Sequence, residues 1–487
     1  MGSVPIYLLL GAWLLLGLVG HDPWKPDEAY TFGLVFHILE TGEWLVPTLG
    51  GLPFVEKPPI FFWTAAVFAK VFGGLLPLHD AARLAAGFYV GLTLWFAYLL
   101  SGRRIAAPLI LAGCLGYLQH AHQLITDNSL VAGVAMGLYG LKTNRGVWLG
   151  TGAGIAFLSK GLVGPGLLGV TALALLFLPA WRHTWRSWPW AMLAFLPWAL
   201  IWPWLLYRHS PALFHEWFVV NNFGRFSGSA GLGGVLDHFH YVNALPWFAA
   251  PAWVLAACTL WRSRKDVTPD LQFALVAFVA MLAVLSASSS ARTLYGLPFL
   301  IPLALLAAAS AEALPRWVDR AVAVVFAIAG AAGWLYWIFV SEVQAPKAGP
   351  VAIGAAIGVT ALWVWSLSFR PALPARWLAG VTLVWGLAMT LYLPQLDWQK
   401  SYRQVAASMR EVRRNNADCV AARDLTEPQR GMFHYYAGIK EPAPQDCRLL
   451  LMHTSSAKEP APGEDWRLVW RGTRPGDDKE FFWLFSR

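Results

Sequence analysis

The chain has 487 residues, of which 57% are hydrophobic and only 13% carry a charged Asp, Glu, Lys or Arg side chain. An ordinary soluble domain is about one quarter charged, so this composition excludes a soluble protein and places most of the chain in lipid. The net charge of +9 does not indicate nucleic-acid binding, because the basic residues are dispersed in short loops between apolar segments.

Apolar segments recur from the N-terminus to about residue 393, and many are long enough to cross a hydrocarbon core as a helix. The first lacks a basic n-region and a clear cleavage site, so we expect an uncleaved helix rather than a signal peptide. We predict about thirteen transmembrane helices, near residues 4–20, 84–101, 106–122, 128–142, 146–158, 162–179, 189–207, 242–261, 271–287, 294–311, 321–340, 350–369 and 376–393.

Every second predicted loop is basic, for example those with Arg103 and Arg104 or with Lys142 and Arg145. Because Lys and Arg collect on the cytoplasmic side, this alternation predicts a cytoplasmic N-terminus. It places the loops at 21–83 and 208–241 outside, together with the tail from Pro394 onward. We therefore expect an integral membrane protein with these loops and the tail on one face.

The composition changes near residue 393, where the chain becomes polar and charged. A helical stretch, YRQVAASMREVRRNN, precedes short apolar runs such as RLLLMH and EFFWLF, which are typical of strands. We predict a transmembrane domain at 1–393, which includes the first external loop at 21–83, and a small α/β extracytoplasmic domain at 394–487. Cys419 and Cys447 fall in this tail, and a disulfide between them requires that the tail be extracytoplasmic.

The first external loop carries two pairs of charged residues. Asp27 and Glu28 occur in HDPWKPDEAYTFG, where a carboxylate could act as a general base or align an acceptor. The same residues are typical of a helix N-terminus, which is the simpler interpretation of this pair alone. Glu56 and Lys57 precede two prolines that fix the backbone. A lysine at headgroup depth suits a lipid phosphate. The alternative is a snorkelling lysine that pairs with its neighbour.

Further charges lie at predicted external ends of later spans. Asp127 is a carboxylate near membrane depth, where charged side chains are costly and often functional. The alternative is that it caps the following helix. Lys160, Arg225 and Arg292 break the positive-inside rule, and together they could bind a lipid-linked phosphate. Each alone could instead bind lipid headgroups. A histidine near the same ends could join Glu56 in a divalent-metal site, but the histidine spacing is not diagnostic.

The segments PDEAY, GEWLVPTLGGLPFVEKPPIFFW, TDN, SKGLVGP, GRF and SASSSARTLYGLPFLIPLALL occur in this order over residues 1 to about 310. Together they resemble the bacterial aminoarabinose transferase family of the GT-C superfamily, which also contains protein mannosyltransferases. The resemblance implies an all-α polytopic GT-C fold in the bacterial inner (plasma) membrane, with residues 1–393 as the catalytic domain and residues 394–487 as a periplasmic domain. It also implies inverting transfer of a sugar from a polyprenyl (undecaprenyl) phosphate carrier to a lipid acceptor, such as lipid A or lipopolysaccharide, at the periplasmic face.

The resemblance also implies roles for single residues. Asp27 and Asp127 match catalytic positions, whereas Lys57, Lys160 and Arg225 match ligands of the carrier phosphate. The remaining matches belong to the substrate cavity, namely Glu28, Glu56, Arg292 and Tyr295. Two positions depart from the family pattern: Asn222 stands where the family has a histidine implicated in metal binding, and Arg292 where it has a lysine. No cofactor is therefore certain, and Glu56 is the ligand if a divalent metal binds.

Several alternatives stay open at this level. The chain could be a transporter or flippase of lipid-linked sugars, a protein O-glycosyltransferase, or an inactive assembly subunit. The acceptor could be a hydroxyl, which requires Asp27 as a base, or a phosphate that is already anionic. The expected partners are a polyprenyl-phosphate sugar, a lipid acceptor and membrane lipids. An enzyme requires the charged residues named above to converge on one cavity.

Overall fold

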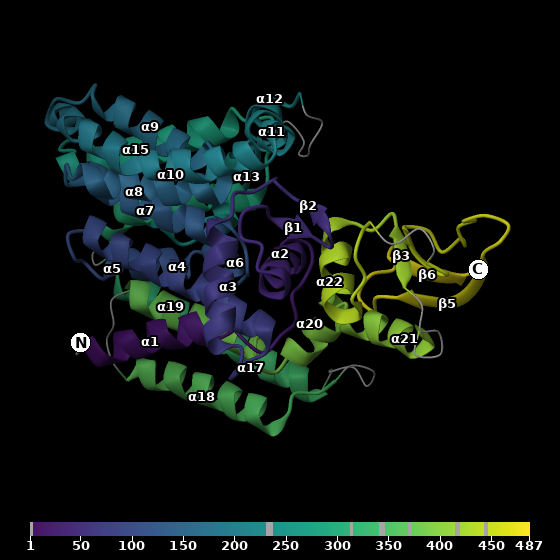
Figure 1. Ribbon diagram of the computed structural model, residues 1–487. Coiled ribbons are helices and arrows are strands. Elements are labelled where there is room, and N and C mark those ends of the chain that lie inside the picture. The colour runs from purple at the N-terminus through teal and green to yellow at the C-terminus, as the bar shows by residue number, and fades with distance from the viewer. Residues whose placement is uncertain are drawn as a thin grey trace.

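The computed structural model describes residues 3–229, 237–311, 315–339, 346–368, 373–413, 419–442 and 447–487. A body of helices forms most of the chain, and a small sheet lies at its C-terminal end (Figure 1). A helix occupies each of the ranges in which we predicted a span. In the first part of the body these are α1 (Ser3–Leu15), α4 (Leu78–Leu100), α5 (Ala106–Gly113), α6 (Leu115–Ala121), α7 (Asp127–Lys142), α8 (Gly146–Lys160), α9 (Val163–Leu175) and α10 (Trp188–His209).

The second part of the body continues this pattern with α13 (His240–Phe248), α14 (Ala252–Arg262), α15 (Pro269–Ser286), η3 (Thr293–Phe299), α16 (Leu300–Ala308), α17 (Arg316–Phe339), α18 (Pro350–Leu367) and α19 (Leu373–Ala388). Short connecting helices lie before and after α10. They are η1 (Pro179–Ser187), α11 (Pro211–His215), the π-helical η2 (Glu216–Gly224) and α12 (Arg225–Ser227).

Five helices within the described ranges are long and apolar enough to cross a membrane: Leu78–Leu100, Pro179–His209, Pro269–Ser286, Arg316–Phe339 and Pro350–Leu367. Two bent helix pairs raise the number to seven, and several shorter apolar helices accompany them. The expectation of a polytopic membrane protein is confirmed at this level. The count of about thirteen spans is not confirmed and stays a prediction.

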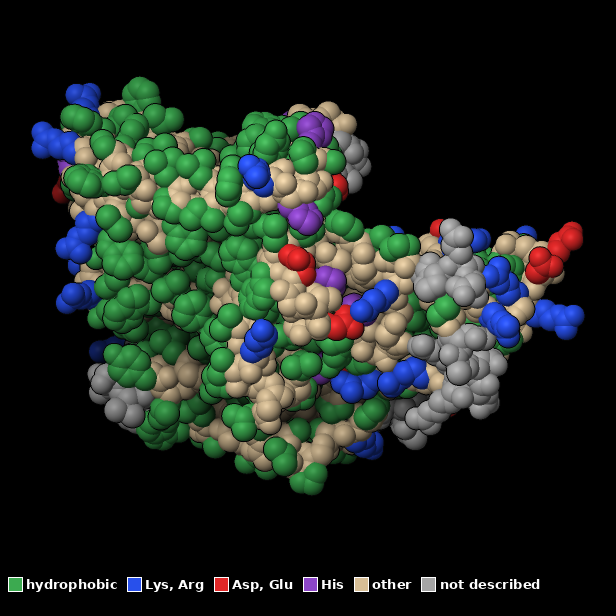
Figure 2. Space-filling view, viewed as in Figure 1, with side chains coloured by type: hydrophobic (Ala, Val, Ile, Leu, Met, Phe, Trp, Pro, Cys, Tyr) green, Lys and Arg blue, Asp and Glu red, His purple; other side chains and the backbone are tan. Residues whose placement is uncertain are grey.

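The surface of the helical body is apolar, as a lipid environment requires. Phe339 in α17 and Val351 in α18 are 78% and 88% exposed, and hydrophobic side chains cover much of the face in Figure 2. Lys and Arg side chains gather instead at the left edge of that view and over the C-terminal end of the chain. The helices therefore expose their apolar side chains over the middle of the body and leave the charges to its two ends.

The first loop is ordered and largely buried. It contains α2 (Asp27–Thr41), the short hairpin strands β1 (Thr48–Leu49) and β2 (Leu52–Pro53), and α3 (Ile60–Phe72). Gly50 and Gly51 form the turn of the hairpin with positive φ angles, which glycine adopts without strain. A Cβ atom on Gly51 would lie 2.1 Å from the carbonyl oxygen of Glu441, so only glycine allows the hairpin to contact the C-terminal region there.

The C-terminal region is an α/β unit, as the sequence predicted. Helix α20 (Leu393–Lys400) leads to α21 (Arg403–Arg413), and the sheet has the order β3-β4-β6-β5 with α22 between β3 and β4. Strand β3 pairs parallel with β4, and the other pairs are antiparallel. The bounds are β3 (Val420–Arg423), α22 (Glu427–Ala437), β4 (Leu449–Thr454), β5 (Arg467–Thr473) and β6 (Phe481–Ser486).

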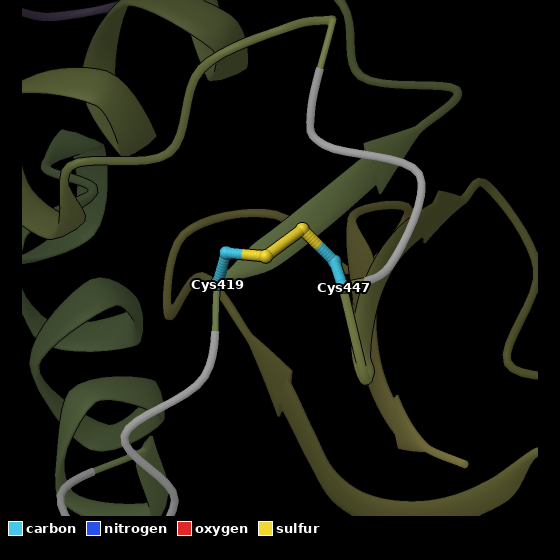
Figure 3. The surroundings of a disulfide bond; sticks show 2 residues. All are labelled: Cys419 and Cys447. Atoms are coloured by element: carbon cyan, nitrogen blue, oxygen red, sulfur yellow. A yellow bond between two sulfur atoms is a disulfide. The ribbon is translucent and has the colours of Figure 1, made fainter.

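A disulfide between Cys419 and Cys447 joins the residues that precede β3 and β4 (Figure 3). Their separation of 28 residues means that the bond closes a loop containing α22. Cross-linking such a loop reduces the freedom of the unfolded chain. The disulfide thereby supports α22, the helix that contacts α2.

Helices α2 and α22 cross closely, as Figure 1 shows. A Cβ atom on Gly33 of α2 would lie 2.6 Å from the Cα atom of Gly431 in α22. A Cβ atom on Gly431 would lie 2.8 Å from the carbonyl oxygen of Ala29. Backbone atoms occupy both positions, so neither contact can relax by a side-chain rotation.

Replacing Gly33 by Ala should push α2 away from α22 and reduce the free energy of unfolding by ~1–3 kcal/mol, the usual cost of overpacking. Thermal unfolding in detergent measures the effect. Gly91→Ala is the matched control, because Gly91 lies within α4 and has no atom within 4 Å of an added Cβ. Equal melting temperatures for the two variants would show that the helix crossing tolerates a methyl group.

Candidate active site

Asp27 lies at the first residue of α2, so the sequence at this point does form a helix N-terminus. The Asp27 carboxylate accepts hydrogen bonds from Arg292 at 2.8 and 3.4 Å and from the Tyr30 hydroxyl at 3.0 Å. Burial alone would raise the pKa of Asp27, but the charges of Lys57 and Arg292 and these hydrogen bonds lower the pKa below its usual value. Asp27 is therefore held as a carboxylate.

Lys57 is buried beside the same helix. Its ammonium donates a hydrogen bond to the Tyr30 hydroxyl and lies 3.9 Å from a carboxylate oxygen of Glu56. Burial alone would lower the pKa of Lys57, but the Tyr30 oxygen and the charges of Glu56 and Asp27 raise it above its usual value. Lys57 is thus a permanent cation with one polar neighbour on α2.

Lys160 ends α8 and Asp127 begins α7, and their side chains form an ion pair of 2.5 Å. The Lys160 ammonium also lies 3.9 Å from the centroid of the Tyr295 ring. On the other side, the Arg292 guanidinium lies 5.8 Å from the same centroid. Tyr295 therefore joins the two ion pairs, Asp127–Lys160 and Asp27–Arg292, into one cluster.

A cavity of about 320 Å³ adjoins this cluster. Glu56, Lys57, Lys160 and Tyr295 line it. The rest of its wall is mainly apolar and comes from α7, α9, η2, α12 and α15, through Leu130, Val163, Val170, Phe223, Phe226, Val284 and Leu285. A cavity lined by two cations and many hydrocarbon side chains suits an amphiphilic anion.

The C-terminal region holds the segment that leads to Asp27. Asp22 is paired with Arg403 and accepts a hydrogen bond from Ser401, and the Trp24 indole donates to Asp397 at 2.9 Å. Lys25 lies 3.2 Å from a carboxylate oxygen of Glu480. These contacts flank the start of α2, so they restrict where Asp27 can lie.

Glu28 has a different position from the one we expected. The sequence placed it in the substrate cavity, but its side chain is buried against Arg83 at 2.9 Å and accepts a hydrogen bond from the Leu124 backbone N–H group. Asp80 binds the same guanidinium at 2.6 Å. Successive helical residues point about 100° apart, so Asp27 and Glu28 cannot both face the site. Glu28 instead holds the first loop to α4.

The structure brings together Asp27, Glu56, Lys57, Asp127, Lys160, Arg292 and Tyr295. The side chain of Arg225 lies outside the described residues, so its predicted contact with a phosphate stays a prediction. Tyr30 was missed by the sequence analysis. Its place in the PDEAY segment, three residues after Asp27 on the same helical face, was the signal that could have identified it.

Asn222, which the sequence analysis matched to a histidine of the aminoarabinose transferase family, lies in η2. Its side-chain oxygen accepts a hydrogen bond from the Leu162 N–H group at 2.9 Å, and its nitrogen donates to the Trp217 carbonyl at 2.8 Å. Asn222 therefore connects η2 to the start of α9. In the part of the chain that the structure describes, no three His, Cys, Asp or Glu side chains form a group that could hold a metal ion. Metal binding by Glu56 thus stays an untested prediction.

No protein-family model matches the chain. Among curated relatives, the undecaprenyl phosphate-α-4-amino-4-deoxy-L-arabinose arabinosyl transferase of Pseudomonas savastanoi pv. phaseolicola is 30% identical over 324 residues, which cover 62% of this chain and 60% of that protein. The undecaprenyl phosphate-α-4-amino-4-deoxy-L-arabinose arabinosyl transferase 1 of Sodalis glossinidius is 29% identical over 350 residues. These residues cover 63% of this chain and 58% of that protein. The chain thus spans about three fifths of the length of the curated relatives it matches.

The fold is that of ArnT from Cupriavidus metallidurans. The crystal structure of the apo state gives a TM-score of 0.73 at 17% identity and covers 99% of this chain and 97% of that one. The structure of the same protein bound to undecaprenyl phosphate gives a TM-score of 0.68 at 17% identity, and the match covers 99% of this chain and 98% of that one. The resemblance to aminoarabinose transferases that the motifs predicted is confirmed by these similarities in sequence and fold.

The different surroundings of Asp27 and Glu28 predict different effects on stability. Glu28→Gln removes one of the two carboxylates that compensate the fully buried Arg83 and leaves only Asp80 on it, so we expect a loss of ~1–3 kcal/mol in the free energy of unfolding. Asp27→Asn should cost much less, because its partner Arg292 is 41% exposed and can be solvated. Thermal unfolding of the two variants tests this order, and a larger loss for Asp27→Asn would contradict it.

Proposed function

We propose that the protein is an integral membrane glycosyltransferase. It takes a sugar from a polyprenyl phosphate carrier, undecaprenyl phosphate, and transfers it to a lipid acceptor such as lipid A at the periplasmic face. The observation that carries the proposal is a cluster of paired carboxylates and cations in which Lys57 and Lys160 line one largely apolar cavity. Asp27, paired with Arg292, belongs to the same cluster. The names of the curated relatives and the ligand bound to ArnT support the same assignment.

The donor would bind with its phosphate at the cations that line the cavity. Lys57 and Lys160 would contact the phosphate, together with Arg225, and the first isoprene units would lie against Val163, Val284 and their apolar neighbours. When the acceptor attacks the anomeric carbon, the bond from that carbon to the phosphate oxygen breaks and its electron pair stays on the phosphate. The cations stabilise this charge as it develops. Asp127 orients Lys160 through their ion pair.

The state of the two carboxylates favours an anionic acceptor. Asp27 is paired with Arg292 and its pKa is lowered, and Asp127 is paired with Lys160. A carboxylate that is stabilised in its charged form is a weak base toward a hydroxyl group. A lipid phosphate requires no proton removal and can use the exposed guanidinium of Arg292 as its first contact. Asp27 then positions Arg292 and the sugar rather than removing a proton.

We also propose the finer topology that the loop charges predict: about thirteen spans, a cytoplasmic N-terminus and a periplasmic domain at 394–487. The disulfide between Cys419 and Cys447 supports this orientation, because such bonds persist in oxidising compartments. The C-terminal region holds the segment that precedes Asp27, which supports a reaction at the same face.

Transfer from a radiolabelled polyprenyl-phosphate sugar to lipid A tests the function in membranes with equal amounts of each variant. We expect Asp27→Asn, Lys57→Met and Lys160→Met to lower the transfer rate ~100-fold or more. Each lysine stabilises the charge that develops on the phosphate, and Asp27 positions Arg292 and the sugar. Lys70→Met is the matched control and should keep the wild-type rate, since Lys70 is an exposed lysine of α3 beside Trp44.

Enzymatically dephosphorylated lipid A should accept no sugar if the acceptor group is a phosphate. Equal transfer to both lipids would instead identify a hydroxyl acceptor. The wild type could instead move the donor lipid across the membrane without forming any glycosidic product. That result would favour a transporter and contradict the proposed activity.

The topology can be tested by thiol labelling in spheroplasts with an impermeant phosphine reductant and an impermeant maleimide. We expect labelling at Cys419 and Cys447 only after reduction, because the disulfide faces the periplasm in the proposed orientation. A variant with both cysteines changed to serine is the control. Labelling that requires permeabilised membranes would place the C-terminal region in the cytoplasm.

A further inference from the structure

We infer that Tyr30 is a positioning residue of this site: its hydroxyl bridges the Asp27 carboxylate and the Lys57 ammonium and fixes the two charges relative to each other. Its role in transfer rests on the proposed function. The bridge itself is a property of the folded chain and can be measured without turnover.

The geometry places Tyr30 between the two groups. It lies three residues after Asp27 in α2, so both side chains share one helical face. The Tyr30 hydroxyl donates to Asp27 Oδ1 at 3.0 Å and accepts a hydrogen bond from Lys57 Nζ. The ring is 5% exposed and packs against Phe54, with ring centroids 5.6 Å apart. Packing therefore holds the ring, and the hydroxyl has a defined position.

The direction of both hydrogen bonds follows from the chemistry of the three groups. An ammonium can only donate, an ionised carboxylate can only accept, and a phenol can do both. Burial raises the pKa of Tyr30, so its hydroxyl keeps the proton that it donates to Asp27. Lys57 lines the cavity, whereas Asp27 does not. The Tyr30 hydroxyl therefore connects a cation that lines the cavity to a carboxylate that lies outside the cavity lining.

Other groups act on Asp27 from several elements. Those within electrostatic reach are the bridging Tyr30, Lys57 in the loop before α3, Arg292 before η3 and His120 on α6. Arg292 keeps its contact when the Tyr30 hydroxyl is removed, so Asp27 stays ionised near neutral pH. Loss of the bridge nevertheless removes one hydrogen bond to the charged form and releases Lys57. The pKa of Asp27 must then rise.

Tyr30→Phe tests the bridge because it keeps the ring and its packing. Hydrophobic carbodiimides react with protonated carboxyl groups, so the pH dependence of labelling at Asp27, measured by mass spectrometry, reports its protonation. We expect the midpoint of labelling to move upward by about one pH unit in Tyr30→Phe. The acid limb of the transfer rate should move in the same direction, and kcat should fall ~10-fold.

Tyr89→Phe is the matched control. Tyr89 is a buried tyrosine of α4 whose hydroxyl is 2.8 Å from that of Thr64, outside the charged cluster. It should change neither the labelling midpoint nor the pH profile. Thermal unfolding confirms that both variants are folded before they are compared. A general loss of packing in Tyr30→Phe would lower activity without moving the midpoint.

The outcomes separate the inference from the proposed function. An unchanged labelling midpoint in folded Tyr30→Phe overturns the bridge even if the wild type transfers sugar. A shifted midpoint with no transfer by the wild type supports the bridge and removes the proposed function. A shift in both the midpoint and the acid limb supports both.

Discussion

Charge compensation at the edge of an apolar bundle is the constraint on which the site depends. A charged side chain at this depth is costly unless it has a partner. Asp27 is paired with Arg292, and Lys160 with Asp127. The first pair joins residues 265 positions apart, so it can form only when the two halves of the bundle have assembled. The cluster is therefore a product of folding, and under the proposed function its charges need little reorganisation during transfer.

Two adjacent carboxylates serve different purposes because they point to different sides of one helix. Glu28 points into the protein and neutralises Arg83, which is completely buried. Asp27 points toward Arg292 and Tyr30 and stays partly accessible. The first interaction fixes α2 against α4, and this fixation gives the second its geometry. Stability and chemistry are thus divided between neighbouring residues.

The C-terminal region acts on the site from a distance. It holds the segment before α2 through Asp22, Trp24 and Lys25, and it packs α22 against α2 at a crossing that requires glycine. The disulfide closes the loop that contains α22. Together these contacts confine α2 on the side opposite the bundle. Since α2 carries both Asp27 and Tyr30, the small sheet contributes to the position of groups that it does not touch.

The amino-acid sequence by itself determined the helices of the body and the strands of the C-terminal region, because apolar length and periodicity are local properties. It also identified Asp27, Lys57, Asp127, Lys160, Arg292 and Tyr295, which the structure brings into one cluster. Only the tertiary structure decided the partner of each charge. The structure places Glu28 outside the predicted cavity and adds Tyr30 to the site, because hydrogen bonds and ion pairs act only over a few ångströms. Which groups come that close depends on how helices distant in sequence are rotated and packed against one another.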